Sequence, residues 1–296
     1  MSKIVLITGA TGFLGSHLVK AFLEQEYSVS ILKRSFSNTW RIDSVISNVI
    51  SFDLDDFLLQ DIFTLLGKVD AVIHTATCYG RKNESYTEIV EANVSFPLKL
   101  LETSAFFGAK VFLNTDTVLS SHLNSYSLSK KHFLDWGKQF AEKKVIRFVN
   151  LKLEHIFGAY DDDSKFVTYI IKNCVNNIEE LNLTQGEQKR DFIHVDEVTA
   201  IYQLLFQKII EKQDFFQEYS IGSGKAIAVR QLVEMIHRLT QSKTFLKFGA
   251  LPYREGEVMF SEADTKAICS LGWIPKYSLE KALIETITKY KESVVL

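Results

Sequence analysis

The feature that most constrains this chain is a short apolar run that leads directly into a cluster of glycines. Residues 3–8 read KIVLIT, a β-branched segment that is too short for a helix and apolar on both faces, as a central parallel strand is. Gly9, Gly12 and Gly15 follow at once and open a stretch with helical spacing. A strand, a glycine turn and a helix in this order predict a nucleotide-binding βαβ unit.

Strand-like and helix-like segments alternate through the first half of the chain. Further apolar runs lie at 28–32, 48–52, 71–74, 111–114 and 145–151, and segments with helical spacing lie between them at 14–22, 57–66, 86–107 and 126–141. This alternation is typical of repeated βαβ units. We therefore predict an α/β fold with a Rossmann-type, doubly wound parallel sheet.

The alternation loosens after residue 158, which suggests a second, smaller region. A helix is expected at 164–176, a strand at 190–195 that runs into a helix at 196–206, another short strand at 219–221, and short helices separated by loops from residue 230 onward. We predict a dinucleotide-binding domain at 1–158, to which 190–222 return. Residues 159–189 and 223–296 would form a C-terminal substrate-binding region over the carboxyl edge of the sheet, where such sheets bind ligands.

Composition excludes several classes of function. The chain has 34 basic and 36 acidic residues and a formal net charge of −2, which argues against nucleic acid as a partner. Three cysteines, Cys78, Cys174 and Cys269, lie too far apart in sequence to suggest a disulfide framework or a cysteine metal site, and the histidines show no metal-binding spacing. There is no apolar run of about 18 residues and no signal peptide, so we expect a cytoplasmic protein that does not enter a membrane.

The end of the predicted second strand indicates which dinucleotide binds. In glycine loops of this kind the pyrophosphate lies against free N–H groups at the helix N-terminus. A carboxylate at the end of the second strand binds the ribose hydroxyls of NAD, whereas a basic residue accepts the 2′-phosphate of NADP. Here the strand ends in Lys33 and Arg34. We expect NADPH, with NAD(H) left open because an exposed strand end with two ordinary cations gives the same pattern.

A tyrosine and a lysine are spaced for proton transfer. Tyr126 and Lys130 are four residues apart at the start of a predicted helix, which places both side chains on one face. A lysine near a tyrosine favours the phenolate and so lowers a phenol pKa that is ordinarily about 10. Taken alone, this spacing also occurs on exposed helices that carry no activity.

Together the glycine loop and this pair resemble the short-chain dehydrogenase/reductase superfamily. The nearer likeness is to its extended branch, the NAD-dependent epimerase/dehydratase family, which contains nucleotide-sugar epimerases, dehydratases and reductases. The likeness covers essentially the whole chain. Its segments are TGATGFLGSHL at 8–18, DLD at 53–55, VIHTA at 72–76, RDFIHVDEV at 190–198, REGE at 254–257 and LGWIP at 271–275.

The resemblance implies roles for individual residues. Cofactor contacts are implied for Gly9, Thr11, Gly12, Phe13, Leu14, Gly15, Lys33, Arg34, Asp53, Leu54, His74, Thr75, Ala76, Asn93, Tyr126 and Lys130. The implied catalytic residues are Thr115, Tyr126 and Lys130, and the implied substrate contacts are Asp116, Thr117, His155, Arg190 and Arg254. In the family the two arginines hold the diphosphate of a nucleotide sugar. The family also implies a homodimer through two helices that flank the sheet, one of them at 126–141.

Departures from the family pattern narrow the expected reaction. Nucleotide-sugar 4,6-dehydratases carry an Asp followed by a Glu after strand five, but here Asp116 is followed by Thr117. No carboxylate in this segment is then left to take the C5 proton, so dehydration is disfavoured. The segments NTDTV, YSLSK, LEHIFG and DDDSKF, with the short loop between Thr115 and Tyr126, look most like the CDP-abequose and CDP-paratose synthases, which are 4-ketoreductases.

The resemblance thus implies NADPH-dependent reduction of the C4 keto group of a nucleotide-linked 4-keto-deoxy sugar, with a CDP-linked sugar favoured. Such a reaction serves O-antigen and lipopolysaccharide biosynthesis at the bacterial surface. The alternative is a nucleotide-sugar 4-epimerase, which uses the same residues but retains NAD between half-reactions. A more remote alternative is a non-catalytic NADP(H)-binding sensor or scaffold, which the presence of both Tyr126 and Lys130 disfavours.

Overall fold

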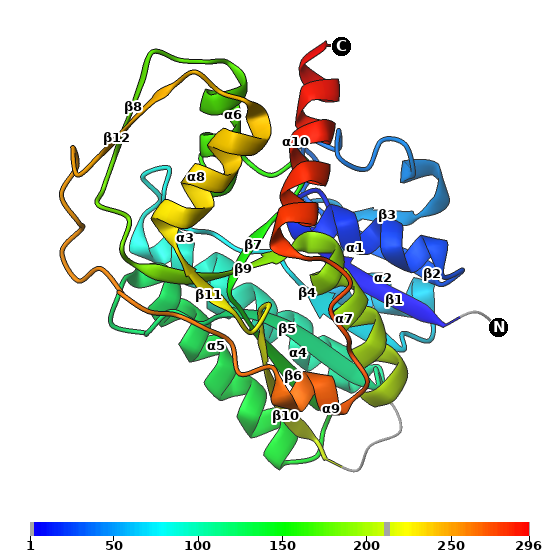
Figure 1. The fold of residues 1–296 in the computed structure, drawn as a ribbon. Helices are drawn as coiled ribbons and strands as arrows, with labels where there is room; N and C mark the ends of the chain where they lie inside the picture. The colour runs from blue at the N-terminus through cyan, green and yellow to red at the C-terminus, as the bar shows by residue number, and fades with distance from the viewer. Residues whose placement is uncertain (1–2, 210–213, 296) are drawn as a thin grey trace. The chain divides into compact units, whose positions relative to one another are not determined.

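The computed structural model describes residues 3–209 and 214–295 (Figure 1). The strands are β1 (Ile4–Thr8), β2 (Ser28–Lys33), β3 (Ile50–Asp53), β4 (Ala71–His74), β5 (Val111–Thr117), β6 (Arg147–Leu153), β7 (His155–Phe157), β8 (Glu180–Leu183), β9 (Lys189–His194), β10 (Phe216–Ile221), β11 (Ala226–Ala228) and β12 (Phe245–Phe248). The α-helices are α1 (Phe13–Glu24), α2 (Leu59–Leu66), α3 (Tyr86–Val90), α4 (Phe96–Phe106), α5 (Ser125–Glu142), α6 (Phe166–Val175), α7 (Val195–Ile209), α8 (Val229–Thr240), α9 (Lys266–Ser270) and α10 (Leu279–Val295). A π-helical turn (Glu91–Ser95) joins α3 to α4.

The chain divides into two compact units. The first contains Met1–Leu153 and Thr199–Tyr219, and the second contains Glu154–Val198 and Ser220–Leu296. Both units are therefore discontinuous in sequence, and the chain passes from one to the other three times. The assignment of the cofactor to the first region and of the substrate to the second stays a prediction.

A seven-stranded sheet forms the centre of the first unit. Its strand order is β10-β6-β5-β4-β1-β2-β3. The pairs β1·β2, β1·β4, β2·β3, β4·β5 and β5·β6 are all parallel. Strands β2 and β3 follow β1 toward one edge of the sheet, and β4, β5 and β6 follow it toward the other edge. The strand order therefore reverses next to β1. The prediction of a doubly wound parallel sheet is confirmed, and in such sheets ligands bind at this reversal.

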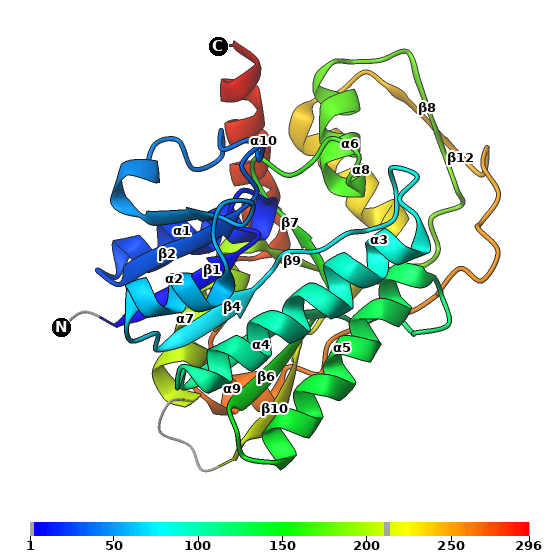
Figure 2. The ribbon, with the colours of Figure 1, turned by 180° about the vertical axis from the view of Figure 1, so that it is seen from behind.

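Helices cover both faces of this sheet. Helices α1 and α7 lie on one face, and α2, α4 and α5 lie on the other (Figures 1 and 2). On the first face the rings of Phe22 and Phe206 meet with centroids 5.6 Å apart. On the second face Phe112, Phe133 and Phe148 form a fully buried cluster between the sheet and α5. Because apolar residues of both faces are buried, the sheet is held in place from both sides.

Strand β5 is longer than its apolar run predicts. The run ends at residue 114, but the strand pairs with β6 through Thr117, with Thr115 opposite Leu151 and Asp116 opposite Lys152. The polar residues 115–117 give no strand signal, because a continuous apolar run is what predicts a strand of this kind. The extension makes Thr115, Asp116 and Thr117 the last residues of the strand before the loop that leads to α5.

The second unit is built from small sheets and helices. Strand β9 pairs with β7 in parallel and with β11 in antiparallel orientation, and β8 pairs with β12 in parallel. Helices α6, α8 and α10 supply apolar side chains to its core, among them Ile170, Leu232 and Leu283. Helices α8 and α10 have 12 and 17 residues, so they are longer than the short helices expected for this part of the chain.

Within 3–209 and 214–295, no helix has the length and apolar character needed to cross a membrane. Over the same ranges, no group of three or more His, Cys, Asp or Glu side chains is arranged to hold a metal ion.

Candidate active site

The glycine loop is shaped by close approach of two backbone segments. Gly9 has a φ of +70°, and a Cβ built there would lie 2.6 Å from the Ala76 nitrogen and 2.6 Å from the Thr75 Oγ1. Only glycine fits both the positive φ and this contact. Gly12 then acts as the N-cap of α1 without a side chain to bond the first-turn N–H groups. The backbone is therefore formed as a cradle against which a pyrophosphate fits.

The end of β2 carries a paired cation. The Lys33 ammonium forms an ion pair with the Asp53 carboxylate, so two predicted cofactor residues contact each other. Arg34 is exposed and its guanidinium lies 4.7 Å from the centroid of the Phe36 ring. Of the two cations predicted to bind a 2′-phosphate, one therefore already has its charge balanced by a carboxylate.

A basic residue that sequence reasoning missed lies beside the glycine loop. Arg41 donates from Nη1 to the Thr11 carbonyl oxygen at 3.5 Å, and its guanidinium lies 4.4 Å from the centroid of the Trp40 ring. No pattern in the sequence indicates this contact, because Arg41 lies in an irregular segment eight residues after the end of β2.

Helix α5 begins just before the predicted catalytic tyrosine. The Asn124 Oδ1 accepts a hydrogen bond from the Ser127 N–H at 2.9 Å, which caps the helix and fixes where it starts. Tyr126 then lies in the first turn, with its ring centroid 4.9 Å from that of Tyr79. Lys130 lies one turn further on and is almost completely buried. The cap therefore sets the position of both predicted catalytic side chains.

Burial dominates the protonation of this pair. Desolvation lowers the pKa of Lys130 to about 8, against the opposing effect of the Asp116 carboxylate. Desolvation also raises the pKa of Tyr126 far above its usual value, and Tyr79 and Asp116 add to this effect. The spacing of the two residues predicts that the lysine lowers the tyrosine pKa. In this structure burial has the larger effect, and the phenol form is favoured.

The hydroxyl predicted to assist Tyr126 is already bonded elsewhere. The Thr115 Oγ1 and the Tyr202 hydroxyl are 2.7 Å apart, and Tyr202 is fully buried on α7. Thr117, two residues along the strand, instead provides a side-chain hydrogen bond that acts to lower the Tyr126 pKa. The structure thus brings Thr117 together with Tyr126 and Thr115 together with Tyr202. The catalytic role of Thr115 stays a prediction.

Two predicted cofactor residues lie behind the site and support it. His74 is fully buried, its Nδ1 lies 2.8 Å from the Thr8 Oγ1, and burial holds its pKa well below the usual value, so the imidazole is neutral. Asn93 lies in the π-helical turn, where its amide accepts from the Cys78 N–H at 2.7 Å and donates to the Ser129 Oγ at 2.9 Å. Asn93 thereby ties the loop after β4 to helix α5.

In the second unit, a buried arginine is held by a carboxylate. Arg190 Nη2 bonds to Glu257 Oε1 at 2.5 Å, and Nη1 donates to the Lys189 carbonyl oxygen at 2.9 Å. Arg254 is exposed, and its carbonyl accepts the Glu257 N–H at 3.1 Å. Glu257 therefore connects the two arginines that are predicted to hold a diphosphate.

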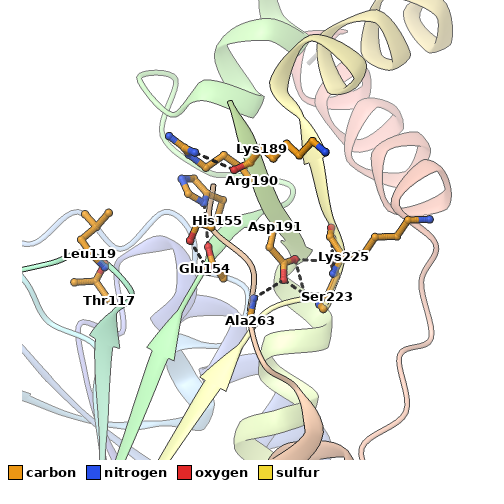
Figure 3. Close-up of polar contacts among 12 residues, drawn as sticks. Thr117, Leu119, Glu154, His155, Lys189, Arg190, Asp191, Ser223, Lys225 and Ala263 are labelled. Carbon is orange, nitrogen blue, oxygen red and sulfur yellow. Dashed lines mark hydrogen bonds and ion pairs between the residues drawn. The ribbon is translucent and has the colours of Figure 1, made fainter. Parts of the chain in front are cut away.

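The strand start beside Arg190 carries a carboxylate and a histidine (Figure 3). Glu154 is buried and its Oε1 accepts from the Ser261 Oγ at 2.7 Å, while Oε2 lies 3.5 Å from the His155 Nδ1. The His155 ring lies 5.7 Å from that of Phe192. Sequence reasoning singled out His155 and missed Glu154, although the two residues are adjacent.

Asp191 organises the same unit. Its carboxylate is completely buried and accepts hydrogen bonds from the Ser223 N–H and Oγ at 2.7 and 2.5 Å, from the Gly224 N–H at 2.9 Å and from the Ala263 N–H at 3.2 Å. Figure 3 shows these donors converging on the carboxylate from two other segments. Asp191 therefore anchors the strand that carries Arg190.

Comparison with known proteins agrees with this arrangement. The profile of the NAD dependent epimerase/dehydratase family matches residues 5–222. The CDP-abequose synthase of Salmonella muenchen is 31% identical to this chain, and the match covers 96% of each protein. The CDP-abequose synthase of Salmonella typhimurium is 32% identical, and the match covers 98% of this chain and 99% of that protein. The solved structure of UDP-glucose 4-epimerase with UDP-glucose from Thermotoga maritima aligns with a TM-score of 0.86 at 23% identity, covering 98% of this chain and 99% of that one.

These findings confirm the fold, the resemblance to the extended short-chain dehydrogenase/reductase branch, and the prediction of an NAD(P)-dependent oxidoreductase. The chain therefore belongs to the NAD dependent epimerase/dehydratase family, whose match begins within β1 and ends just after β10.

Proposed function

We propose that this chain uses NADPH to reduce the C4 keto group of a nucleotide-linked 4-keto-deoxy sugar, with a CDP-linked sugar favoured. The observation that carries the proposal is the match to two CDP-abequose synthases along almost the whole of each chain. We assign the reaction to the bacterial cytoplasm and its product to surface polysaccharide, as the sequence resemblance implies.

The state of Tyr126 supports reduction as the direction of the reaction. A bound NADPH supplies the hydride, and the alkoxide that develops at the sugar oxygen then needs a proton. Burial keeps Tyr126 in its phenol form, so it has a proton to donate. Lys130 lies one helical turn away as a cation that stabilises negative charge on the phenol oxygen after the transfer. The predicted role of Thr115 is a second hydrogen bond to the sugar oxygen.

The residues of the glycine loop fit a dinucleotide. Thr75 and Ala76 lie so close to Gly9 that no side chain fits there. No side chain caps the first turn of α1, so its N–H groups can bind an anion. Arg34 is exposed at the end of β2, where a 2′-phosphate is expected. These residues would hold the cofactor, which would supply the hydride for the reduction.

Arginines of the second unit are proposed to bind the diphosphate. Arg190 has its guanidinium bonded to Glu257, so its orientation is set before a ligand arrives. Arg254, Thr117 and His155 remain proposed contacts to the nucleotide sugar. The family resemblance implies a substrate contact for Asp116 as well, but its carboxylate is buried and bonded within the protein.

The experiment that tests the proposal is NADPH oxidation against a panel of CDP-, dTDP-, UDP- and GDP-linked 4-keto sugars. We expect turnover with at least one of them, and strongest turnover with a CDP-linked sugar. Tyr126→Phe should abolish turnover and leave the NADPH dissociation constant nearly unchanged, because the hydroxyl moves the proton and is only one of many implied contacts to the cofactor. Bound NADPH without turnover on any member of the panel would refute the reductase assignment.

One observation favours a second candidate, a nucleotide-sugar 4-epimerase that retains NAD. Asp53 already neutralises Lys33, which reduces the positive charge available to a 2′-phosphate. The cofactor that remains bound through purification distinguishes the candidates. Tightly held NAD and interconversion of C4 epimers without added NADPH would support the epimerase.

A homodimer through the helices on the α5 face of the sheet is also proposed. Phe106 on α4 is 83% exposed and Trp136 on α5 is 45% exposed, so large apolar side chains face outward there. Light scattering of the purified chain should give a dimer mass, and Trp136→Glu should shift the protein to monomer without unfolding it.

A further inference from the structure

Asp116 faces into the protein. Its side chain has no exposed surface, although it lies between two threonines at the end of β5. Oδ2 accepts hydrogen bonds from the Lys131 ammonium at 2.8 Å and from the Asn150 amide at 2.9 Å, and Oδ1 accepts from the Thr117 N–H at 2.7 Å. Three donors thus hold the carboxylate inside, so it is not placed to act as an acid toward a sugar.

The carboxylate belongs to a network of alternating charges that runs from the buried Asp116 to the partly exposed Lys152 and Glu218. Lys131 also donates to the Thr117 carbonyl oxygen at 2.6 Å, so the same ammonium binds strand and carboxylate. The Asn150 amide nitrogen is shared between Asp116 and Glu218, the latter at 2.9 Å. Glu218 is in turn paired with Lys152 at 2.8 Å. Each carboxylate has its own ammonium partner, and Asn150 joins the two pairs.

The network lies against the predicted catalytic pair. Lys131 follows Lys130 directly on α5, and the Asp116–Lys131 bond ties that helix to β5. The Asp116 charge favours the ammonium form of Lys130 and the phenol form of Tyr126, whereas the Lys131 charge disfavours the ammonium form of Lys130. Further groups that face the pair are Tyr79 and Arg81 at Tyr126, and the neutral His74 at Lys130.

We propose that Asp116 and Lys131 form a positioning pair that fixes α5 against β5 and holds Tyr126 as a proton donor, and thereby biases the site toward reducing a carbonyl. The inference rests on the proposed function, since a reductase must begin each turnover with the phenol protonated. An enzyme that begins by oxidising a hydroxyl needs the opposite, a phenolate that takes a proton. A fixed carboxylate beside the tyrosine works against that form.

The first test needs neither cofactor nor substrate. The ε-methylene signal of Lys130 in ¹³C-lysine-labelled protein is followed against pH by NMR, and the Lys130→Met spectrum identifies the signal. We expect its midpoint to fall in Asp116→Asn and to rise in Lys131→Met, because the two variants remove opposite charges. Glu218→Gln is the matched control, since it removes a carboxylate that also bonds to Asn150 yet is not among the groups that shift Lys130. A common direction for both variants, or equal midpoints, overturns the proposal.

The second test is the pH profile of kcat with NADPH and the best sugar of the panel. The loss of activity at high pH, where Lys130 loses its charge, should move to lower pH in Asp116→Asn and to higher pH in Lys131→Met, because the two removed charges act on Lys130 in opposite directions. A purely structural role would lower kcat equally at all pH values. If the wild-type chain shows no NADPH-dependent turnover, the proposed function fails, and the NMR midpoints still decide the role of the pair. Should Asp116→Asn fail to fold, the Lys131→Met midpoint decides it alone.

Discussion

The hydroxyl groups of Thr115 and Tyr202 are 2.7 Å apart, although β5 and α7 are far apart in sequence. Both residues belong to the first unit, and Tyr202 is completely buried. Thr115 is expected to bond to a sugar oxygen, but its hydroxyl already contacts Tyr202. Tyr202 lies on α7, which covers the face of the sheet opposite to the face covered by α5 and Tyr126. Two roles for Thr115 follow from this contact, and they are separated by replacing its partner.

Tyr202→Phe should separate support of the fold from catalysis. Removal of the phenol oxygen leaves the Thr115 hydroxyl without this partner, so we expect a loss of about 1 kcal/mol in the free energy of unfolding, measured in urea. If Thr115 acts on the sugar, Thr115→Val should reduce kcat by a much larger factor than Tyr202→Phe. Equal kcat values for the two variants would show that Thr115 serves the fold and not the reaction.

Arg34 and Lys33 should differ in their effect on the cofactor. Arg34 is exposed, whereas Lys33 is paired with Asp53. Arg34→Ala should weaken NADPH binding about tenfold and leave NADH binding unchanged, because a charge-assisted hydrogen bond to the 2′-phosphate contributes roughly 1.5 kcal/mol. Lys33→Ala should have the smaller effect. Calorimetry with both cofactors checks this, and an equal loss of NADH affinity would contradict a phosphate contact.

The buried Lys130 makes stability depend on pH. Burial lowers its pKa from 10.5 to about 8 in the folded chain. Between these two pH values, the unfolded chain binds a proton that the folded chain does not. The contribution of Lys130 to the free energy of unfolding therefore increases as the pH rises from about 8 to 10.5. Lys130→Met lacks the gain. The free energy of unfolding is measured in urea at pH 7.5 and at pH 9.5. From the lower to the higher pH, the value for wild type should rise relative to the value for Lys130→Met. An equal difference at both pH values would contradict the prediction.

Gly137 should tolerate no side chain. It lies on α5, and a Cβ there would come within 2.2 Å of the Phe148 ring, which is fully buried on β6. Gly137→Ala should therefore lower the free energy of unfolding by about 1–3 kcal/mol, despite the better helix propensity of alanine. The control is Gly137→Ala combined with Phe148→Leu, which makes room and should restore part of the loss. Unchanged stability of the single variant would mean that α5 can move away from the sheet.

The features that the sequence predicts correctly are those whose pattern lies within a few neighbouring residues. The KIVLIT run, Gly9 and the Tyr126 and Lys130 spacing each lie within a few residues, and all were placed on the elements where the structure has them. The short strands β8 and β12 were not predicted, because each gains its stability from a partner about 65 positions away. The contact between Asp116 and Lys131 escaped prediction for the same reason: it joins different elements, and no local pattern distinguishes a buried aspartate from a substrate contact.

The role of burial was also beyond the sequence argument. Spacing alone indicated that Lys130 lowers the pKa of Tyr126, because charge proximity is visible in a helical pattern. Desolvation depends on every segment that covers the pair, including the Tyr79 loop, and its effect on both residues is the larger one.

The Asp191 carboxylate has a consequence for the order in which the chain is made and folded. Its donors come from Ser223, Gly224 and Ala263, the last of them 72 positions further along the chain. A nascent chain that has not yet reached that position would leave a buried anion without part of its hydrogen bonding, which is costly. The Asp191 carboxylate therefore has all of its hydrogen bonds only after most of the protein has been synthesised, and we expect a C-terminal truncation before Ala263 to loosen the strand that carries Arg190.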